Sequence, residues 1–96
     1  MKVRFTSSAR AQLLSALTCI RRDNPGAALS FRERVETVLR RLEEFPNSGG
    51  VVPEFPEFPY REVIISPYRF YCRVKGEIVW IVAVWHGPQL PEEPES

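Results

Sequence analysis

The stretch from Tyr68 to Trp85 restricts the possible fold of this chain more than any other part of the sequence. Side chains alternate in character over residues 68–75, and Lys75-Gly76-Glu77 then leads into an apolar run, Ile78 to Trp85. Alternation with a period of two is typical of a strand with one buried face. Glycine suits a hairpin turn that needs positive φ, and an unbroken apolar run indicates an interior strand. The sequence therefore predicts a β-hairpin whose second strand lies inside a sheet.

The alternation also assigns the side chains of the first strand to two faces. One face carries apolar or aromatic groups: Tyr68, Phe70, Cys72 and Val74. The other carries three cations and a tyrosine: Arg69, Tyr71, Arg73 and Lys75. We expect the first set to face the core. The second set is an unusual surface for so small a domain, and it is the first place to look for function.

Two amphipathic helices are predicted upstream of the hairpin. Lys2–Phe5 alternates as a short strand, and Thr6, Ser7 and Ser8 are candidate N-caps for the first helix. Asp23-Asn24-Pro25-Gly26 ends that helix, and the second runs from about residue 27 to residue 44, with apolar residues three and four apart. A proline-rich loop then leads to a strand at Tyr60 to Ile65 and a turn at Ser66-Pro67.

The predicted order β-α-α-β-β-β is that of an α+β domain in which a small, mostly antiparallel sheet packs on a helical hairpin. A chain of 96 residues is one domain, which we expect over residues 1–90, followed by an acidic, proline-rich and flexible tail at 91–96. If the hairpin covers one face of the sheet, Arg69, Tyr71 and Arg73 lie on the other, uncovered face. Arg61 on the neighbouring strand is a further candidate, whose facing depends on the strand register.

Composition excludes several kinds of protein. No apolar run approaches the roughly 20 residues that span a bilayer, and the N-terminal stretch has no apolar signal-peptide core, so we expect a cytoplasmic protein. The two cysteines occupy apolar positions and there is one histidine, which argues against a zinc site, and no cofactor is expected. Without the last six residues, 13 basic residues face 12 − 3 = 9 acidic ones, a net charge of +4. That charge accommodates an acidic partner or nucleic acid.

Six different short motifs follow one another along the chain in a characteristic order. They are Asn24-Pro25-Gly26-Ala27-Ala28, Leu42-Glu43-Glu44-Phe45-Pro46-Asn47-Ser48-Gly49, Val52-Pro53-Glu54, Tyr60-Arg61-Glu62-Val63, Pro67-Tyr68-Arg69-Phe70-Tyr71-Cys72-Arg73-Val74 and Val84-Trp85-His86-Gly87. In this order and at these spacings the chain resembles toxins of the ParE/RelE superfamily of bacterial type II toxin–antitoxin modules. The similarity covers about residues 3 to 88, and ParE-like members resemble the chain most.

The resemblance implies a small α+β toxin that arrests growth and is neutralised by a cognate antitoxin in a toxin–antitoxin hetero-oligomer. ParE-like toxins are associated with inhibition of DNA gyrase, whereas RelE-like toxins cut mRNA on the ribosome. Under the nuclease alternative, Arg69 matches the arginine of the family Tyr-Arg motif and Arg73 is a second phosphate clamp. His86 then stands where some family nucleases have His or Tyr, although a lone histidine at a strand end is more often structural.

The distribution of charge favours the ParE-like alternative. Before the tail the only lysines are Lys2 and Lys75, the loop from Gly49 to Pro59 has acids and no base, and Gly50 stands where the family usually has arginine. We therefore expect a toxin that acts by protein–protein contact. The residues expected to bind the partner are Arg61, Arg69, Tyr71 and Arg73. A ribosome-dependent mRNA endonuclease and an interaction module that has kept the fold but lost the activity remain open alternatives.

Overall fold

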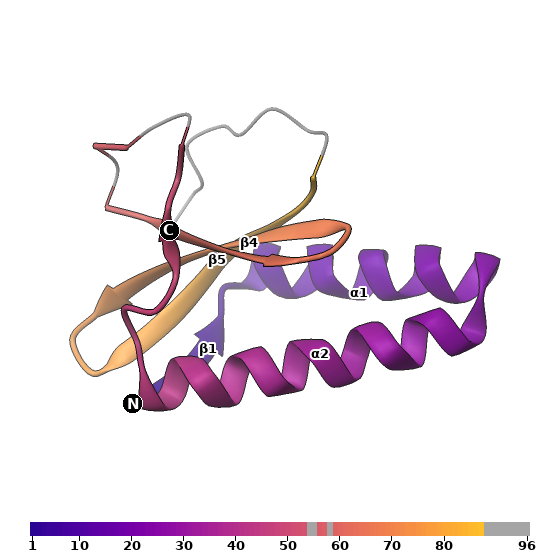
Figure 1. The fold of residues 1–96 in the computed structure, drawn as a ribbon, viewed down its shortest axis with the longest axis horizontal. Coiled ribbons are helices and arrows are strands. Elements are labelled where there is room, and N and C mark those ends of the chain that lie inside the picture. The colour runs from indigo at the N-terminus through magenta and orange to yellow at the C-terminus, as the bar shows by residue number, and fades with distance from the viewer. Residues whose placement is uncertain (54–55, 58, 88–96) are drawn as a thin grey trace.

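The computed structural model describes residues 1–53, 56–57 and 59–87, and it has the α+β architecture predicted from the sequence. Its elements are β1 (Lys2–Phe5), α1 (Ser7–Asp23), α2 (Pro25–Glu44), β2 (Gly50–Val51), β3 (Arg61–Ile65), β4 (Tyr68–Lys75) and β5 (Ile78–His86). The two helices form a hairpin below one face of the sheet (Figure 1). We call the face covered by the helices the inner face and the other the outer face. The predicted acidic tail, residues 91–96, and the end of the expected domain at residue 90 lie outside the described residues.

Each helix begins at a side chain that caps it. Thr6 Oγ1 accepts a hydrogen bond from the backbone N–H of Ala9 at 3.2 Å, and Asn24 Oδ1 accepts one from Ala27 at 3.1 Å. Pro25 occupies the first turn of α2, where its missing N–H costs no hydrogen bond. The helices therefore join at a single residue, Asn24, and α2 begins two residues earlier than the sequence suggested.

The sheet has the strand order β1-β5-β4-β3-β2, so β5 is an interior strand, as predicted. β1 pairs with β5 in parallel, and the other pairs are antiparallel. Gly76, with φ of 62°, supplies the left-handed residue of the β4–β5 turn. The short strand β2 was not predicted; it pairs Gly50 with Glu62 and Val51 with Arg61.

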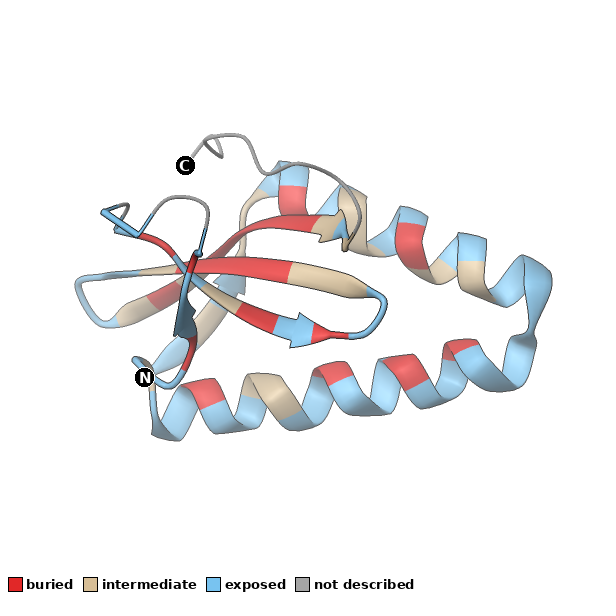
Figure 2. Cartoon of the chain, turned by 45° about the horizontal axis from the view of Figure 1, so that its top comes forward, coloured by how far each residue is buried: buried red, intermediate tan, exposed pale blue. Residues whose placement is uncertain are grey.

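The main core lies between the helices and the inner face of the sheet. Phe31 and Leu42 of α2 pack there with Phe70 of β4 and with Val79 and Ile81 of β5. In Figure 2 the buried positions of each helix recur on the side that faces the sheet. The predicted apolar stripe of α1 packs against the same core: Leu13, Leu17 and Ile20. Among the described residues, no helix is long and apolar enough to cross a membrane.

The outer face is not uncovered, and in this the sequence-based expectation was wrong. A second apolar cluster lies there: Val52, Tyr60, Tyr71, Val82 and Ala83, with Trp80 and Trp85 packed against it. The register between β4 and β5 shifts where Tyr71 pairs with Ala83 and Cys72 with Ile81, so Val82 is an extra residue, a β-bulge. Val82 and Ala83 therefore both face outward.

Candidate functional site

The structure brings three of the predicted residues together on the outer face of β4. Arg69, Tyr71 and Arg73 alternate with core residues along this strand, as expected. Four residues of strand span about 13 Å, so Arg69 and Arg73 stand well apart. Their surroundings differ.

Arg69 is held in an ion pair with Glu62 of β3. Its Nε and Nη2 both donate to Glu62 Oε2, at 2.8 and 2.5 Å, and the two side chains are only 12% and 10% exposed. The guanidinium also lies 5.5 Å from the centre of the Tyr71 ring, within the range of a cation–π contact. The guanidinium of Arg69 therefore interacts mainly with side chains of the same molecule.

Tyr71 is a packing residue of the second cluster. It is 2% exposed, and its ring meets that of Trp85 edge to face at a centroid distance of 5.4 Å. Such an arrangement is favourable for aromatic pairs. Tyr71 therefore presents little surface to a partner.

Arg73 is more accessible. It is partly exposed, and its guanidinium lies 5.9 Å from the centre of the Tyr60 ring. It borders a hollow of about 280 Å³ that is lined by Thr6, Arg73, Lys75, Trp80 and Val82. Of the three residues on this strand, Arg73 best fits a surface that receives another molecule.

Arg61 and His86 lie on the inner side of the sheet, apart from the other candidates. Arg61 is opposite Cys72, a residue of the main core, and its Nη1 donates to the carbonyl oxygen of Gly49 at 3.4 Å. His86 is opposite Tyr68, and the two rings meet edge to face at 5.4 Å. The set proposed for a nuclease, Arg69, Arg73 and His86, is thus divided between two faces.

Two further cations on the outer face, Lys2 and Arg4, were not predicted as part of the site. β1 places Lys2 and Arg4 beside β5, and β4 places Arg73 and Lys75 on its other side. We call this surface the Trp80 face and define it by six residues: Lys2, Arg4, Arg73, Lys75, Ile78 and Trp80. The alternation of Lys2–Phe5 already put both cations on one face, but it could not show which strand β1 joins.

The cysteines differ in environment. Cys72 is buried, and that burial raises the pKa of its thiol to about 11. Cys19 is exposed on α1, although the sequence pattern placed it among the apolar positions of the helix. Within the part of the chain that the structure describes, no group of three or more His, Cys, Asp or Glu side chains is placed to hold a metal ion.

Comparisons with known proteins agree with this fold. A family model described as the ParE toxin of the type II toxin–antitoxin system, parDE, matches residues 3–91. A solved chain described as "Chromosomal ParDE TA system from P. aeruginosa" has a TM-score of 0.69 and 22% sequence identity, covering 90% of this chain and 95% of that one. It shows the same fold. No protein of curated function matches the sequence. Since the family model spans nearly the whole of the described fold, this chain belongs to the ParE toxin family of type II toxin–antitoxin systems.

Proposed function

We propose that this protein arrests growth by binding and inhibiting DNA gyrase in the cytoplasm, and that a cognate antitoxin neutralises it in a hetero-oligomer. Membership of the ParE family supports the toxin assignment. The observation that carries the choice of mechanism is the division of Arg69, Arg73 and His86 between the two faces of the sheet.

An RNA-cleaving site needs a base, an acid and cations close to one phosphate. Here Arg69 is paired with Glu62 in a nearly buried ion pair, and His86 lies across the sheet from it. A protein that works by contact needs no such assembly. This arrangement therefore favours inhibition by binding over the mRNA endonuclease.

A role in partner binding is proposed for Arg61, Arg69, Tyr71 and Arg73, with Arg61 and Arg73 in direct contact. Arg61 is exposed and Arg73 partly exposed, so these two can meet carboxylates of the antitoxin without rearrangement. Arg69 and Tyr71 contribute by holding the outer face in shape. The solved chain with this fold was described as part of a ParDE system, which supports an antitoxin as the partner.

The direct test is DNA supercoiling by purified gyrase with and without the protein. We expect inhibition that is relieved by the co-purified antitoxin. Absence of inhibition at micromolar protein would contradict the gyrase target. Primer extension on translated mRNA would then identify an endonuclease by cuts in the ribosomal A site, and harmless expression in a host without antitoxin would indicate an inactive interaction module.

A further inference from the structure

Two rows of cations flank an apolar row on the outer face of β1, β5 and β4. The strand register forms two rungs: Lys2, Ile78 and Lys75 in one, and Arg4, Trp80 and Arg73 in the next. Directly opposite side chains share a face of the sheet, so each rung has the order cation, apolar, cation. Neighbouring strands are about 4.8 Å apart, which separates the two cation rows by about 10 Å.

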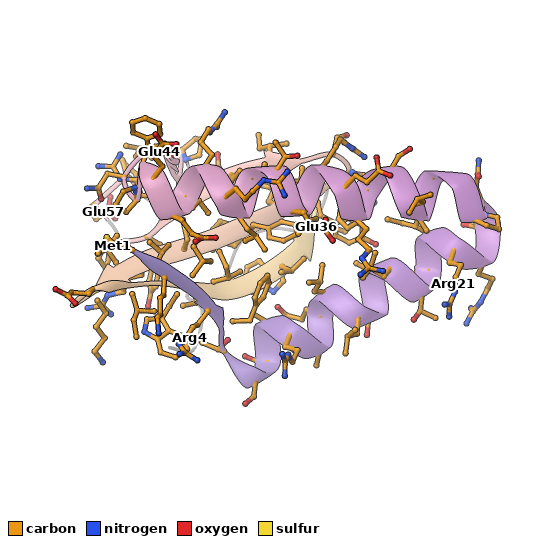
Figure 3. The ribbon with its side chains drawn as sticks, turned by 90° about the horizontal axis from the view of Figure 1, so that it is seen from below. Met1, Arg4, Arg21, Glu36, Glu44 and Glu57 are labelled. Atoms are coloured by element: carbon orange, nitrogen blue, oxygen red, sulfur yellow. The ribbon has the colours of Figure 1, made fainter. Side chains whose placement is uncertain are left out.

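The cations of the Trp80 face are not neutralised within the described part of the chain. Within the described residues, ion pairs join Arg32 to Glu36 and Arg69 to Glu62, and neither pair involves the Trp80 face. Glu77 shares a hollow with Lys2 and Arg4 at the margin of the face, but forms no ion pair with them. Figure 3 shows Arg4 well away from Glu36 and Glu44 of α2. The face therefore presents a net positive charge to a partner.

Trp80 stands between two hollows that can accept side chains. One, of about 280 Å³, borders Trp80 and Val82 on the β4 side. The other, of about 350 Å³, lies on the β1 side and is lined by Val3, Arg4, Phe5, Arg10 and Trp80. Ile78 and Trp80 are both partly exposed. The centre of the face thus offers apolar surface while its flanks offer positive charge.

The two-sided pattern distinguishes between possible ligands. An α-helix with its side chains is about 10–12 Å wide, which matches the separation of the cation rows. An amphipathic helix with an apolar stripe and carboxylates on both flanks would therefore meet the apolar row and both cation rows together. A single nucleic-acid strand follows a charged groove with its backbone and stacks its bases beside it, so it would use one row and leave the other unpaired.

We propose that the Trp80 face binds an acidic amphipathic helix of a protein partner, with its apolar stripe over Ile78 and Trp80. Carboxylates on one flank meet Lys2 and Arg4, and those on the other flank meet Arg73 and Lys75. This inference rests on the proposed function, because it takes the antitoxin as the partner that carries the helix. It does not depend on gyrase as the target.

The test uses the full chain and a fluorescein-labelled helical peptide of about five turns, with leucines three and four apart and glutamates on both flanks. Fluorescence anisotropy measures its dissociation constant. Arg4→Glu with Arg73→Glu should weaken binding at least about tenfold at low salt. Arg21→Glu with Arg40→Glu, the matched control on the helices, makes the same change in net charge and should alter binding less than about threefold. If the first pair fails to fold by circular dichroism, Arg4→Gln with Arg73→Gln replaces it.

The inference would be overturned if the peptide did not bind, if both variant pairs lost binding equally, or if a labelled oligothymidylate bound more tightly and its binding were lost in the Arg4 and Arg73 pair. A variant without residues 91–96 that binds the peptide more than about tenfold more tightly would show that the chain's own acidic segment is the occupant, which also overturns it. Peptide binding without gyrase inhibition would remove only the gyrase target, and inhibition without peptide binding would remove only this inference.

Discussion

At the scale of single residues, the Glu62 and Arg69 side chains form the most deeply buried ion pair in the described structure. Two hydrogen bonds reach one carboxylate oxygen, and both side chains are almost covered. A charged pair that is removed from water depends on its partner, because a single remaining charge would be poorly solvated. The Arg32 and Glu36 pair on α2 differs, since its side chains are 69% and 51% exposed. The two pairs provide a matched comparison within one protein.

Glu62→Ala should lower the free energy of unfolding by about 2 kcal/mol, because it removes two charge-assisted hydrogen bonds from a covered site. Glu36→Ala should change it by less than about 0.5 kcal/mol, as is usual for exposed pairs one helical turn apart. Urea denaturation followed by tryptophan fluorescence measures both. Equal effects of the two substitutions would show that burial does not strengthen the Glu62 pair.

The two cysteines should react at very different rates. Cys19 is exposed, whereas Cys72 is buried and the pKa of its thiol is raised to about 11. A thiol-specific reagent at pH 8 should modify Cys19 quickly and Cys72 only after unfolding, because the thiolate is the reactive form. Rapid modification of both thiols in the native protein would contradict the burial of Cys72.

The raised pKa of the Cys72 thiol also predicts how the free energy of unfolding depends on pH. The folded state keeps the Cys72 proton that the unfolded state loses near pH 9.0, so this contribution to stability is complete below pH 9 and falls towards pH 11.

At the scale of secondary-structure elements, the sequence predicted those helices and strands that depend on local residue patterns. Both helices, their turn at Asn24 and the strands β1, β3, β4 and β5 follow from spacing, caps and turn residues. β2 could not be predicted, because two residues have no periodicity and Gly50 and Val51 are a strand only through pairing with β3. Strict alternation along β5 also fails at Val82, since a bulge there puts two neighbouring residues on one face.

The candidate site depended on register, which the sequence does not contain. Arg69, Tyr71 and Arg73 share a face through simple alternation, and this prediction was confirmed. The pairing of Arg61 with Cys72 places it on the inner side, and the parallel pairing of Arg4 with Trp80 creates the second cation row. The first pairing depends on the register of the β3–β4 hairpin, and the second joins segments that are distant in sequence. A local pattern therefore could not indicate them.

Two glycines with different requirements stand at the start of β2, Gly49 just before the strand and Gly50 as its first residue. A Cβ at Gly49 would lie 3.1 Å from Arg61 Cβ and 3.2 Å from the Glu62 carbonyl oxygen, whereas at Gly50 the nearest such atom is 4.0 Å away. Gly49→Ala should therefore lower the free energy of unfolding by about 1 kcal/mol or more. Gly50→Arg should change it by less than about 0.5 kcal/mol. Thermal unfolding measures both. A larger loss at Gly50 would mean that this position needs glycine.

At the scale of the whole molecule, the two faces of the sheet have different tasks. The inner face is closed by the helical hairpin and contains the main core. The outer face is divided: its half near Arg69, Tyr71 and Trp85 is packed and internally paired, whereas the Trp80 face is partly exposed and positively charged. A net charge of +1 for the chain hides this division. The location of the charges on the fold, rather than the net charge of the chain, therefore supports function by contact.

The position of His86 on the inner side leads to a prediction that separates contact from catalysis. If the protein inhibits gyrase by binding through its outer face, His86→Ala should change the concentration for half-inhibition of supercoiling by less than about threefold, and induced cells should still stop growing. If His86 were a general acid or base, its loss would reduce cleavage by about 100-fold or more, and growth arrest would disappear with it. Circular dichroism should confirm that the variant stays folded without the ring contact to Tyr68, which lies 5.4 Å away. A folded His86→Ala protein that no longer arrests growth would argue against the contact mechanism, because the outer face carries none of the atoms removed.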